Sequence, residues 1–153
     1  MRCVMLLASA TLFFSTLGQA AGSGADDSDE TKIRGAWQLV STTKKGVETK
    51  IDAKGDDQQM VFTFEEQSWK AKVGPKGAPV EITGTYVLDP KQTPKLLDVT
   101  VRGTGGATDV YAVYKFEKDQ LWIRVRDGGG QRPPDFEILA DDCNTLVFRR
   151  AAK

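Results

Sequence analysis

The sequence contains no histidine, and this absence removes several classes of chemistry. Histidine supplies the commonest general base near neutral pH, the base of Ser-His-Asp and Cys-His catalytic groups, and many of the ligands that bind zinc. Enzymes that work with carboxylates or lysine are still allowed, but adjacent acidic pairs on a strand point to opposite faces and cannot share a site. We therefore expect a non-enzymatic binding protein with no catalytic residue, metal site or cofactor.

Cysteine is also scarce, with Cys3 and Cys143 the two examples in 153 residues. Removal of the N-terminal segment, argued next, leaves Cys143 alone, so an internal disulfide is impossible. Two aspartates precede it, whereas reactive cysteines lie in electropositive, accessible settings. An inert, partly buried cysteine is the favoured interpretation, and pairing with another chain is the alternative.

Long apolar runs are absent except near the N-terminus, from Val4 to Leu17. Arg2 precedes this run, and the small residues Gly18 and Ala20 follow it, which is the pattern of an export signal. The run is short for a membrane span. Residues 1–20 are therefore predicted to be a signal peptide cleaved after Ala20, with an uncleaved N-terminal anchor as the alternative. The mature protein is expected to be exported, periplasmic or extracellular, with no transmembrane segment.

Neither sign of charge is in excess, since the chain has 21 basic and 21 acidic residues. Cleavage after Ala20 leaves 20 basic and 21 acidic residues, a net charge of −1. This balance gives no indication of a nucleic acid or an anionic membrane as partner.

Residues 21–32, AGSGADDSDETK, are small and acidic without apolar periodicity, so they predict a flexible, solvated leader.

The rest of the chain is built from short runs of β-branched and aromatic residues between turn-forming residues. In residues 121–126, for example, Leu, Ile and Val alternate with Trp and two Arg, which predicts one apolar face and one wet face. Eight strands are predicted, over residues 36–42, 60–65, 68–73, 81–88, 96–102, 109–117, 120–126 and 145–149. Short connections favour an antiparallel meander, and eight such strands can close into a barrel. The polar segment 44–58 is the exception and is interpreted as a lid, a short helix or a wide loop.

The first predicted strand opens with the pattern Gly35-Ala36-Trp37, and the last ends in Arg149 and Arg150. With eight strands between them, the chain resembles the lipocalin superfamily. The resemblance implies that Trp37 packs across the closed end of the barrel and that one of the two arginines covers it. A cation over the ring would add cation–π energy to burial. A tryptophan that is only a core residue is the alternative.

A closer resemblance extends over residues 33–153. The segments LDPKQTPKLLDVTV (88–101), YKFEKDQLWIRV (114–125) and QRPPDFE (131–137) are similar to a small lipocalin-like domain found in many copies in planctomycete bacteria. Ala36 and Arg124 depart from that pattern. The resemblance implies an all-β, eight-stranded, antiparallel up-and-down lipocalin-like barrel, and no activity, because that family has no established biochemical role.

Four aromatic residues are candidates for a ligand site, because their spacing lets them face inward and tyrosines suit a pocket with few polar groups. They are Phe62, Phe64, Tyr86 and Tyr114. Arg132, stiffened by the prolines that follow it, could bind the carboxylate of a ligand, although a structural ion pair with Asp98 or Asp135 is favoured.

Two functions follow from these residues. The first is binding of a small apolar or amphipathic ligand inside the barrel. The alternative is a filled barrel whose loops, especially 44–58 and 127–135, bind another protein at the cell envelope. An enclosed cavity of roughly 300 Å³ or more, the low end for ligand sites, would favour the first.

Overall fold

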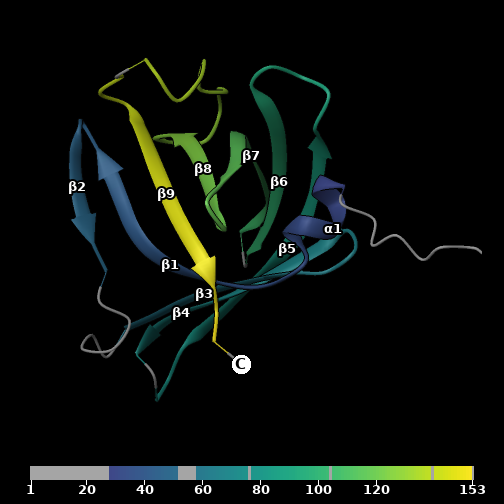
Figure 1. Cartoon of the computed structure of the whole chain (residues 1–153). Coiled ribbons are helices and arrows are strands. Elements are labelled where there is room, and N and C mark those ends of the chain that lie inside the picture. The colour runs from purple at the N-terminus through teal and green to yellow at the C-terminus, as the bar shows by residue number, and fades with distance from the viewer. Residues whose placement is uncertain (1–27, 52–57, 76, 104, 139, 153) are drawn as a thin grey trace, which may run out of the picture.

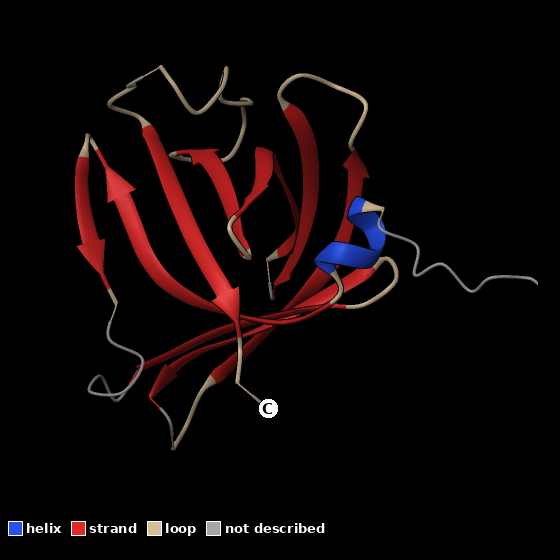
Figure 2. Cartoon of the chain, viewed as in Figure 1, coloured by secondary structure: helices blue, strands red, loops and turns tan. Residues whose placement is uncertain are grey.

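The strands of the computed structural model form one sheet whose first and last strands pair with each other (Figures 1 and 2). The structure describes residues 28–51, 58–75, 77–103, 105–138 and 140–152. The predicted signal peptide lies outside the described residues. The elements are α1 (Asp29–Ile33), β1 (Gly35–Lys44), β2 (Val47–Lys50), β3 (Gln58–Phe64), β4 (Ser68–Pro75), β5 (Val80–Asp89), β6 (Lys95–Gly103), β7 (Gly106–Glu117), β8 (Gln120–Arg126) and β9 (Cys143–Arg150).

The barrel consists of β1 and β3 to β9, each hydrogen-bonded to its neighbour in antiparallel register, with β9 paired back to β1. This confirms the predicted all-β, eight-stranded, up-and-down barrel. Inward side chains alternate with outward ones, as the sequence pattern requires: Leu121 and Ile123 are buried in the core cluster. Closure removes the unpaired edges that an open sheet would present.

The segment from Lys44 to Gln58 differs from its prediction. Its described part contains β2, a strand additional to the eight strands of the barrel. This strand forms a hairpin with the second half of β1. Lys45 and Gly46 make the turn with positive φ, and a bulge after Leu39 lets β1 leave β3 and continue along β9. All four residues of β2 are exposed, so no apolar alternation marked it as a strand. Residues 52–57 lie outside the described residues.

The connections alternate between the two ends of the barrel. The β3–β4, β5–β6 and β7–β8 turns lie at the same end as α1, the start of β1 and the end of β9; we call this the helix end. The β4–β5, β6–β7 and β8–β9 connections and the β1–β2 turn lie at the other, which we call the loop end. Several of the loop-end connections run along the top of Figure 1.

The outer face of β7 to β9 is not the wet surface that alternation predicts. Val113 and Arg124 are cross-strand partners on this face, yet Val113 is fully buried and Arg124 is 5% exposed. The connection between β8 and β9 accounts for this, since the carbonyl of Ile138 accepts a hydrogen bond from the Arg124 guanidinium and Pro133 is itself buried. The predicted loop 127–135 and the residues after it therefore pack against the barrel wall instead of extending into solvent.

Candidate functional site

The inside of the barrel holds a cavity of about 220 Å³ whose walls are formed by apolar side chains alone. Strands β3, β4 and β6 to β9 all contribute to it. The residues that matter most for the argument below are Phe62, Phe64, Trp69, Val99, Val101 and Val125. The volume is below the roughly 300 Å³ that marks the low end of ordinary ligand sites, so side chains fill much of the barrel.

The cavity lies toward the loop end. Val101, Val125 and Leu146 face inward there and pack against the core, yet each is only partly buried. Toward the helix end the inward residues Leu97, Leu121 and Phe148 are fully buried, with 0% exposure. The loop-end part of the cavity wall is therefore more exposed than the part formed by Leu97 and Phe148.

Of the aromatic residues predicted to line a ligand site, the structure places Phe62 and Phe64 on the cavity wall. Tyr86 and Tyr114 face inward but are not among the residues that line the cavity, and this corrects the prediction. Tyr86 donates its hydroxyl hydrogen to the backbone oxygen of Glu65 at 2.6 Å, in the β3–β4 turn. Both tyrosines lie nearer the helix end, and their hydroxyl groups are satisfied by the protein.

Arg132 is also removed from the cavity and takes the structural role that was favoured for it. Its guanidinium donates to a carboxylate oxygen of Asp98 at 2.5 Å and to the backbone oxygen of Ala112 at 2.6 Å. The same guanidinium lies 5.5 Å from the ring centre of Tyr111. Arg132 therefore fastens the β8–β9 connection to β6 and β7, and it is not a ligand-binding residue of the cavity.

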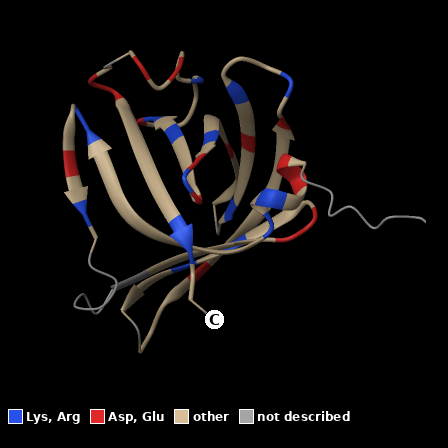
Figure 3. Ribbon diagram, viewed as in Figure 1, with Lys and Arg blue, Asp and Glu red and all other residues tan. Residues whose placement is uncertain are grey.

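Trp37 lies in the core of the helix end, 2% exposed, and its indole Nε1 donates to the backbone oxygen of Ile33 at 2.6 Å. Of the two candidate arginines, Arg150 covers it, with the guanidinium carbon 4.0 Å from the ring centre. The guanidinium also donates to the backbone oxygens of Lys32 and Arg34, and partial burial lowers the pKa of Arg150 below its usual range. Arg150 thereby ties the end of β9, the blue arrowhead in Figure 3, to the chain around α1.

The backbone at position 35 requires the glycine that opens the Gly-x-Trp pattern. Its φ is +102°, a backbone conformation that other residues rarely adopt, and a Cβ there would lie 3.0 Å from the Arg150 guanidinium. The Gly-x-Trp pattern thus supplies a ring and the space for the cation that covers it. Gly35, Trp37 and Arg150 come together as predicted, whereas no ring contact involves Arg149 among the described residues.

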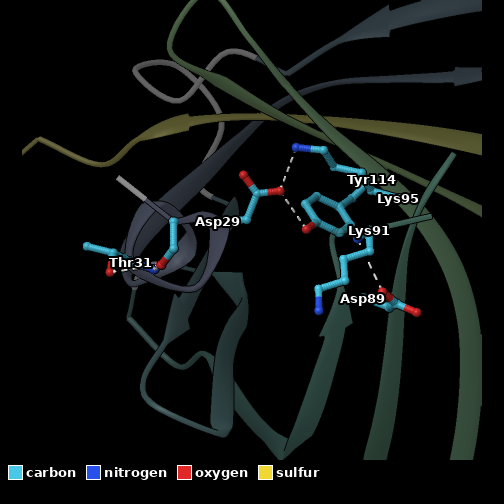
Figure 4. Close-up of polar contacts among 7 residues, drawn as sticks. Asp29, Thr31, Asp89, Lys91, Lys95 and Tyr114 are labelled. Atoms are coloured by element: carbon cyan, nitrogen blue, oxygen red, sulfur yellow. Dashed lines mark hydrogen bonds and ion pairs between the residues drawn. The ribbon is translucent and has the colours of Figure 1, made fainter. Parts of the chain in front are cut away.

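Asp29 lies at the centre of a polar network at the helix end (Figure 4). Its carboxylate accepts a hydrogen bond from the Tyr114 hydroxyl at 2.7 Å and pairs with the Lys95 ammonium at 2.7 Å. Burial by itself raises the pKa of Asp29, but the hydrogen bonds from Lys95 and Tyr114 and the charge of Lys95 outweigh it, so the net pKa lies below the usual value. Burial, followed by the hydrogen bond to Asp29, raises the pKa of Tyr114.

This network corrects the prediction of a solvated leader over residues 21–32. From Asp29 on, the leader is a short helix capped by Ser28, and Asp29 is 9% exposed. Residues 21–27 lie outside the described residues. The sequence gives no local signal for this packing, because the partners of Asp29 lie 66 and 85 positions further along the chain.

Sequence reasoning also missed Trp69, which lines the cavity and is 6% exposed. It stands opposite Gly84 in the register of β4 and β5, and a Cβ at Gly84 would come within 2.6 Å of the indole nitrogen. That nitrogen is buried and has no hydrogen-bond partner among the described residues. A glycine in the middle of the strand EITGTYV was the available signal, since such a glycine often marks the close approach of another group.

Within the described ranges, no three Asp, Glu or Cys side chains gather where a metal ion could be held. None of the helices in that part of the chain has the length and apolar character needed to cross a membrane. Cys143 is buried and its thiol lies 3.5 Å from a carboxylate oxygen of Asp142.

No protein-family model, curated protein or solved structure matches the chain. The closed eight-stranded antiparallel barrel is shown by its architecture and is compatible with a lipocalin-like fold, and the resemblance to the planctomycete domain rests on the sequence motifs alone.

Proposed function

We propose that this protein is an exported, non-enzymatic binding protein whose barrel holds a small apolar or amphipathic ligand. The observation that carries the proposal is the exclusively apolar lining of the interior cavity; its volume of about 220 Å³ is smaller than the roughly 300 Å³ that would favour a ligand on size alone. A ligand that enters gains contacts with these apolar walls, and its own apolar surface is removed from water. The absence of histidine supports binding over catalysis.

The volume limits the ligand. An engineered apolar cavity of about 150 Å³ accommodates benzene, so a cavity of about 220 Å³ suits one ring with a short substituent or a short alkyl chain. A polar group of an amphipathic ligand would lie at the loop end, where the inward residues are half-exposed. Large polycyclic or long-chain ligands require movement of the barrel wall.

Binding of ethylbenzene, followed by calorimetry and by shifts of methyl resonances of Val99 and Val101, tests the proposal. Val125→Phe fills the cavity from the loop end and should reduce affinity at least about tenfold, the effect of losing roughly 1.4 kcal/mol of contacts. Val87→Phe makes the same change on a side chain that is 68% exposed on the outer wall, and it should leave binding unchanged.

Two results would contradict the ligand proposal. One is no saturable binding of ethylbenzene, hexane or toluene to the parent protein at the solubility limit of each. The other is equal affinity of the parent and the Val125→Phe variant, which would place the bound molecule elsewhere.

A second candidate function, binding of another protein through the loop-end connections, is favoured by two exposed apolar side chains. Val47 on the β1–β2 hairpin is 67% exposed, and Ile138 in the β8–β9 connection is 51% exposed. Native mass spectrometry of the protein purified from its own organism separates the two functions. A retained small molecule supports the first, and a retained protein that the double substitution Val47→Lys with Ile138→Lys releases supports the second.

Export is the remaining element of the proposal, and it rests on Arg2, the apolar run after it and the small residues at 18 and 20. We expect the protein isolated from the periplasm or medium to begin at Ala21, as measured by intact-mass spectrometry. An intact chain beginning at Met1 as the main species would overturn this part of the proposal without affecting the cavity.

A further inference from the structure

A second hollow lies on the outer face of the barrel wall, under the connection between β8 and β9. This outer groove has a volume of about 190 Å³. The residues that decide its chemistry are Thr43, Lys45, Lys115, Trp122, Arg124 and Phe136. None of the described residues that line it is acidic.

Strand register brings the polar residues of the groove into one row. Thr43 of β1 stands opposite Thr145 of β9, and Thr145 stands opposite Arg124 of β8. The next row pairs Lys115 of β7 with Trp122 of β8. Four strands and the β8–β9 connection therefore fix the walls of the groove, so its shape does not depend on a single flexible loop.

Arg124 is a buried cation without a carboxylate partner in the described part of the chain. Its Nη2 donates to the backbone oxygen of Ile138, and its Nε is buried with no acceptor. Trp122 lines the same groove, and its Nε1 is likewise buried without an acceptor. Two buried hydrogen-bond donors without an acceptor and one uncompensated charge thus belong to residues that line the groove.

The other charges around the groove increase this imbalance. Lys45 lines the groove and takes part in no ion pair among the described residues. Asp127 pairs with Lys44 at 3.0 Å and interacts more weakly with the charge of Lys45, and Asp142 pairs with Arg126 at 3.1 Å. The Lys115 ammonium pairs with Glu117 at 2.8 Å, so it contributes less net charge than Lys45 and Arg124.

Aromatic side chains form the other half of the groove. The Lys115 ammonium lies 4.9 Å from the ring centre of Trp122 and 5.1 Å from that of Phe136. A planar apolar group can lie against these rings, while an attached anion faces Lys45 and Arg124. Guanidinium and ammonium groups beside threonine hydroxyls are the donors that carboxylates and phosphates need.

We propose that the outer groove binds a small organic molecule through an oxyanion, a carboxylate or a phosphate, with the apolar part of the molecule on Trp122 and Phe136. The oxyanion neutralises Arg124 and Lys45. Because the Arg124 Nε and the Trp122 Nε1 are covered, direct hydrogen bonds to them require a small shift of the side chains that line the groove. This site is separate from the interior cavity and does not depend on the function proposed for it.

Titration with benzoate, inorganic phosphate and toluene tests the proposal, with the indole N–H resonances of Trp122, Trp37 and Trp69 followed by NMR. We expect benzoate to bind and to shift the Trp122 resonance, with an affinity that falls as salt rises. Phosphate that competes with benzoate shows that the oxyanion alone suffices, and benzoate binding without competition by phosphate shows that the organic carboxylate is required. Both results support the site.

Paired substitutions distinguish a specific anion-binding site from a general effect of the net charge of the protein. Lys45→Gln should weaken benzoate binding about two- to fivefold, as expected for a partly exposed ion pair, while Lys91→Gln removes the same charge from the β5–β6 turn at the helix end and should leave it unchanged. Arg124→Gln should weaken binding more than about tenfold. If that variant fails to fold, Lys45→Gln still decides the outcome, because it removes no buried charge and keeps the Trp122 resonance.

Four results would overturn the proposal. The first is that toluene shifts the Trp122 resonance as much as benzoate, which makes the groove only an apolar surface. The second is that Lys91→Gln and Lys45→Gln weaken benzoate binding equally. The third is that neither benzoate nor phosphate moves the Trp122 resonance at millimolar concentration. Binding of benzoate that is abolished by Val125→Phe would also overturn it, because the molecule would then lie in the interior cavity.

Discussion

The two ends of this barrel are built on different principles. At the helix end, inward side chains such as Leu121 and Phe148 are fully buried, and the Tyr114 hydroxyl donates to the carboxylate of Asp29. At the loop end, inward residues such as Val101 and Val125 are partly buried and border an apolar cavity. This difference indicates that the helix end contributes most to the stability of the barrel and that the loop end holds the candidate ligand site. A well-packed region can compensate for a less well-packed one in the same domain.

The helix end also joins parts of the chain that are far apart in sequence. Arg150 contacts backbone oxygens 116 and 118 positions earlier, and Tyr114 contacts a carboxylate 85 positions earlier. Contacts of this kind close long loops and so carry an entropic cost that burial must offset. We therefore expect substitutions at the helix end to reduce the free energy of unfolding more than comparable ones at the loop end.

The largest effect is expected for Trp37→Ala. Removal of a large buried aromatic side chain costs about 3 to 5 kcal/mol of unfolding free energy. Val101→Ala at the loop end removes two partly buried methyl groups and should cost about 1 kcal/mol. Urea denaturation of both variants measures the contrast. Equal costs, or a Trp37→Ala variant as stable as the parent, would break the proposed division between the ends.

A smaller effect is expected for Asp29→Asn, which leaves the Tyr114 hydroxyl and the Lys95 ammonium without the carboxylate. At neutral pH the loss should be about 1 to 3 kcal/mol. Because the pKa of Asp29 is lower in the folded protein than the value of about 3.9 in an unfolded chain, its stabilisation is present above about pH 4 and is lost as the pH falls through the folded value.

Thermal melts between pH 7 and pH 2 test this pH dependence. The parent should lose stability more steeply than Asp29→Asn as the pH falls below about 4, so the two curves should converge. Asp109→Asn removes a carboxylate at the loop end and serves as the control for lost charge. Parallel curves for the parent and Asp29→Asn would show that the network at the helix end does not stabilise the ionised carboxylate.

The barrel itself could be predicted from the sequence because alternation is a local property. Strands such as 120–126 show it within seven residues, and the Gly-x-Trp pattern marks the first strand. Alternation states which face a side chain occupies but not its position along the barrel axis. For this reason Tyr86 and Tyr114 were correctly expected to face inward and wrongly expected to line the cavity.

The other differences between the sequence-based predictions and the structure arise from contacts between residues that are far apart in sequence. The helix α1 has five residues and no apolar stripe, and it is held by side chains from β6 and β7. Arg124 alternates outward as predicted but is buried because the β8–β9 connection lies over it. The path of a connection rich in glycine and proline is decided by tertiary contacts such as Arg132 with Asp98, which no local pattern records.

The smallest expected effect is the coupling between Trp37 and the arginine that covers it, and it tests the helix end most specifically. A double-mutant cycle with Trp37→Leu and Arg150→Met should give a coupling of about 0.5 to 1 kcal/mol, because the cation lies 4.0 Å from the ring centre but remains exposed to solvent. Arg150→Met alone should cost more than this coupling, since it also removes the hydrogen bonds to the backbone oxygens of Lys32 and Arg34. Arg149 is adjacent in sequence and faces the opposite side of the strand, so the same cycle with Arg149→Met should give a coupling near zero. Both cycles remove one positive charge from the end of β9, so their difference isolates the contact with the ring from the general loss of charge. Equal couplings in the two cycles would mean that Arg150 acts through charge alone and that the ring of Trp37 is stabilised only by its burial.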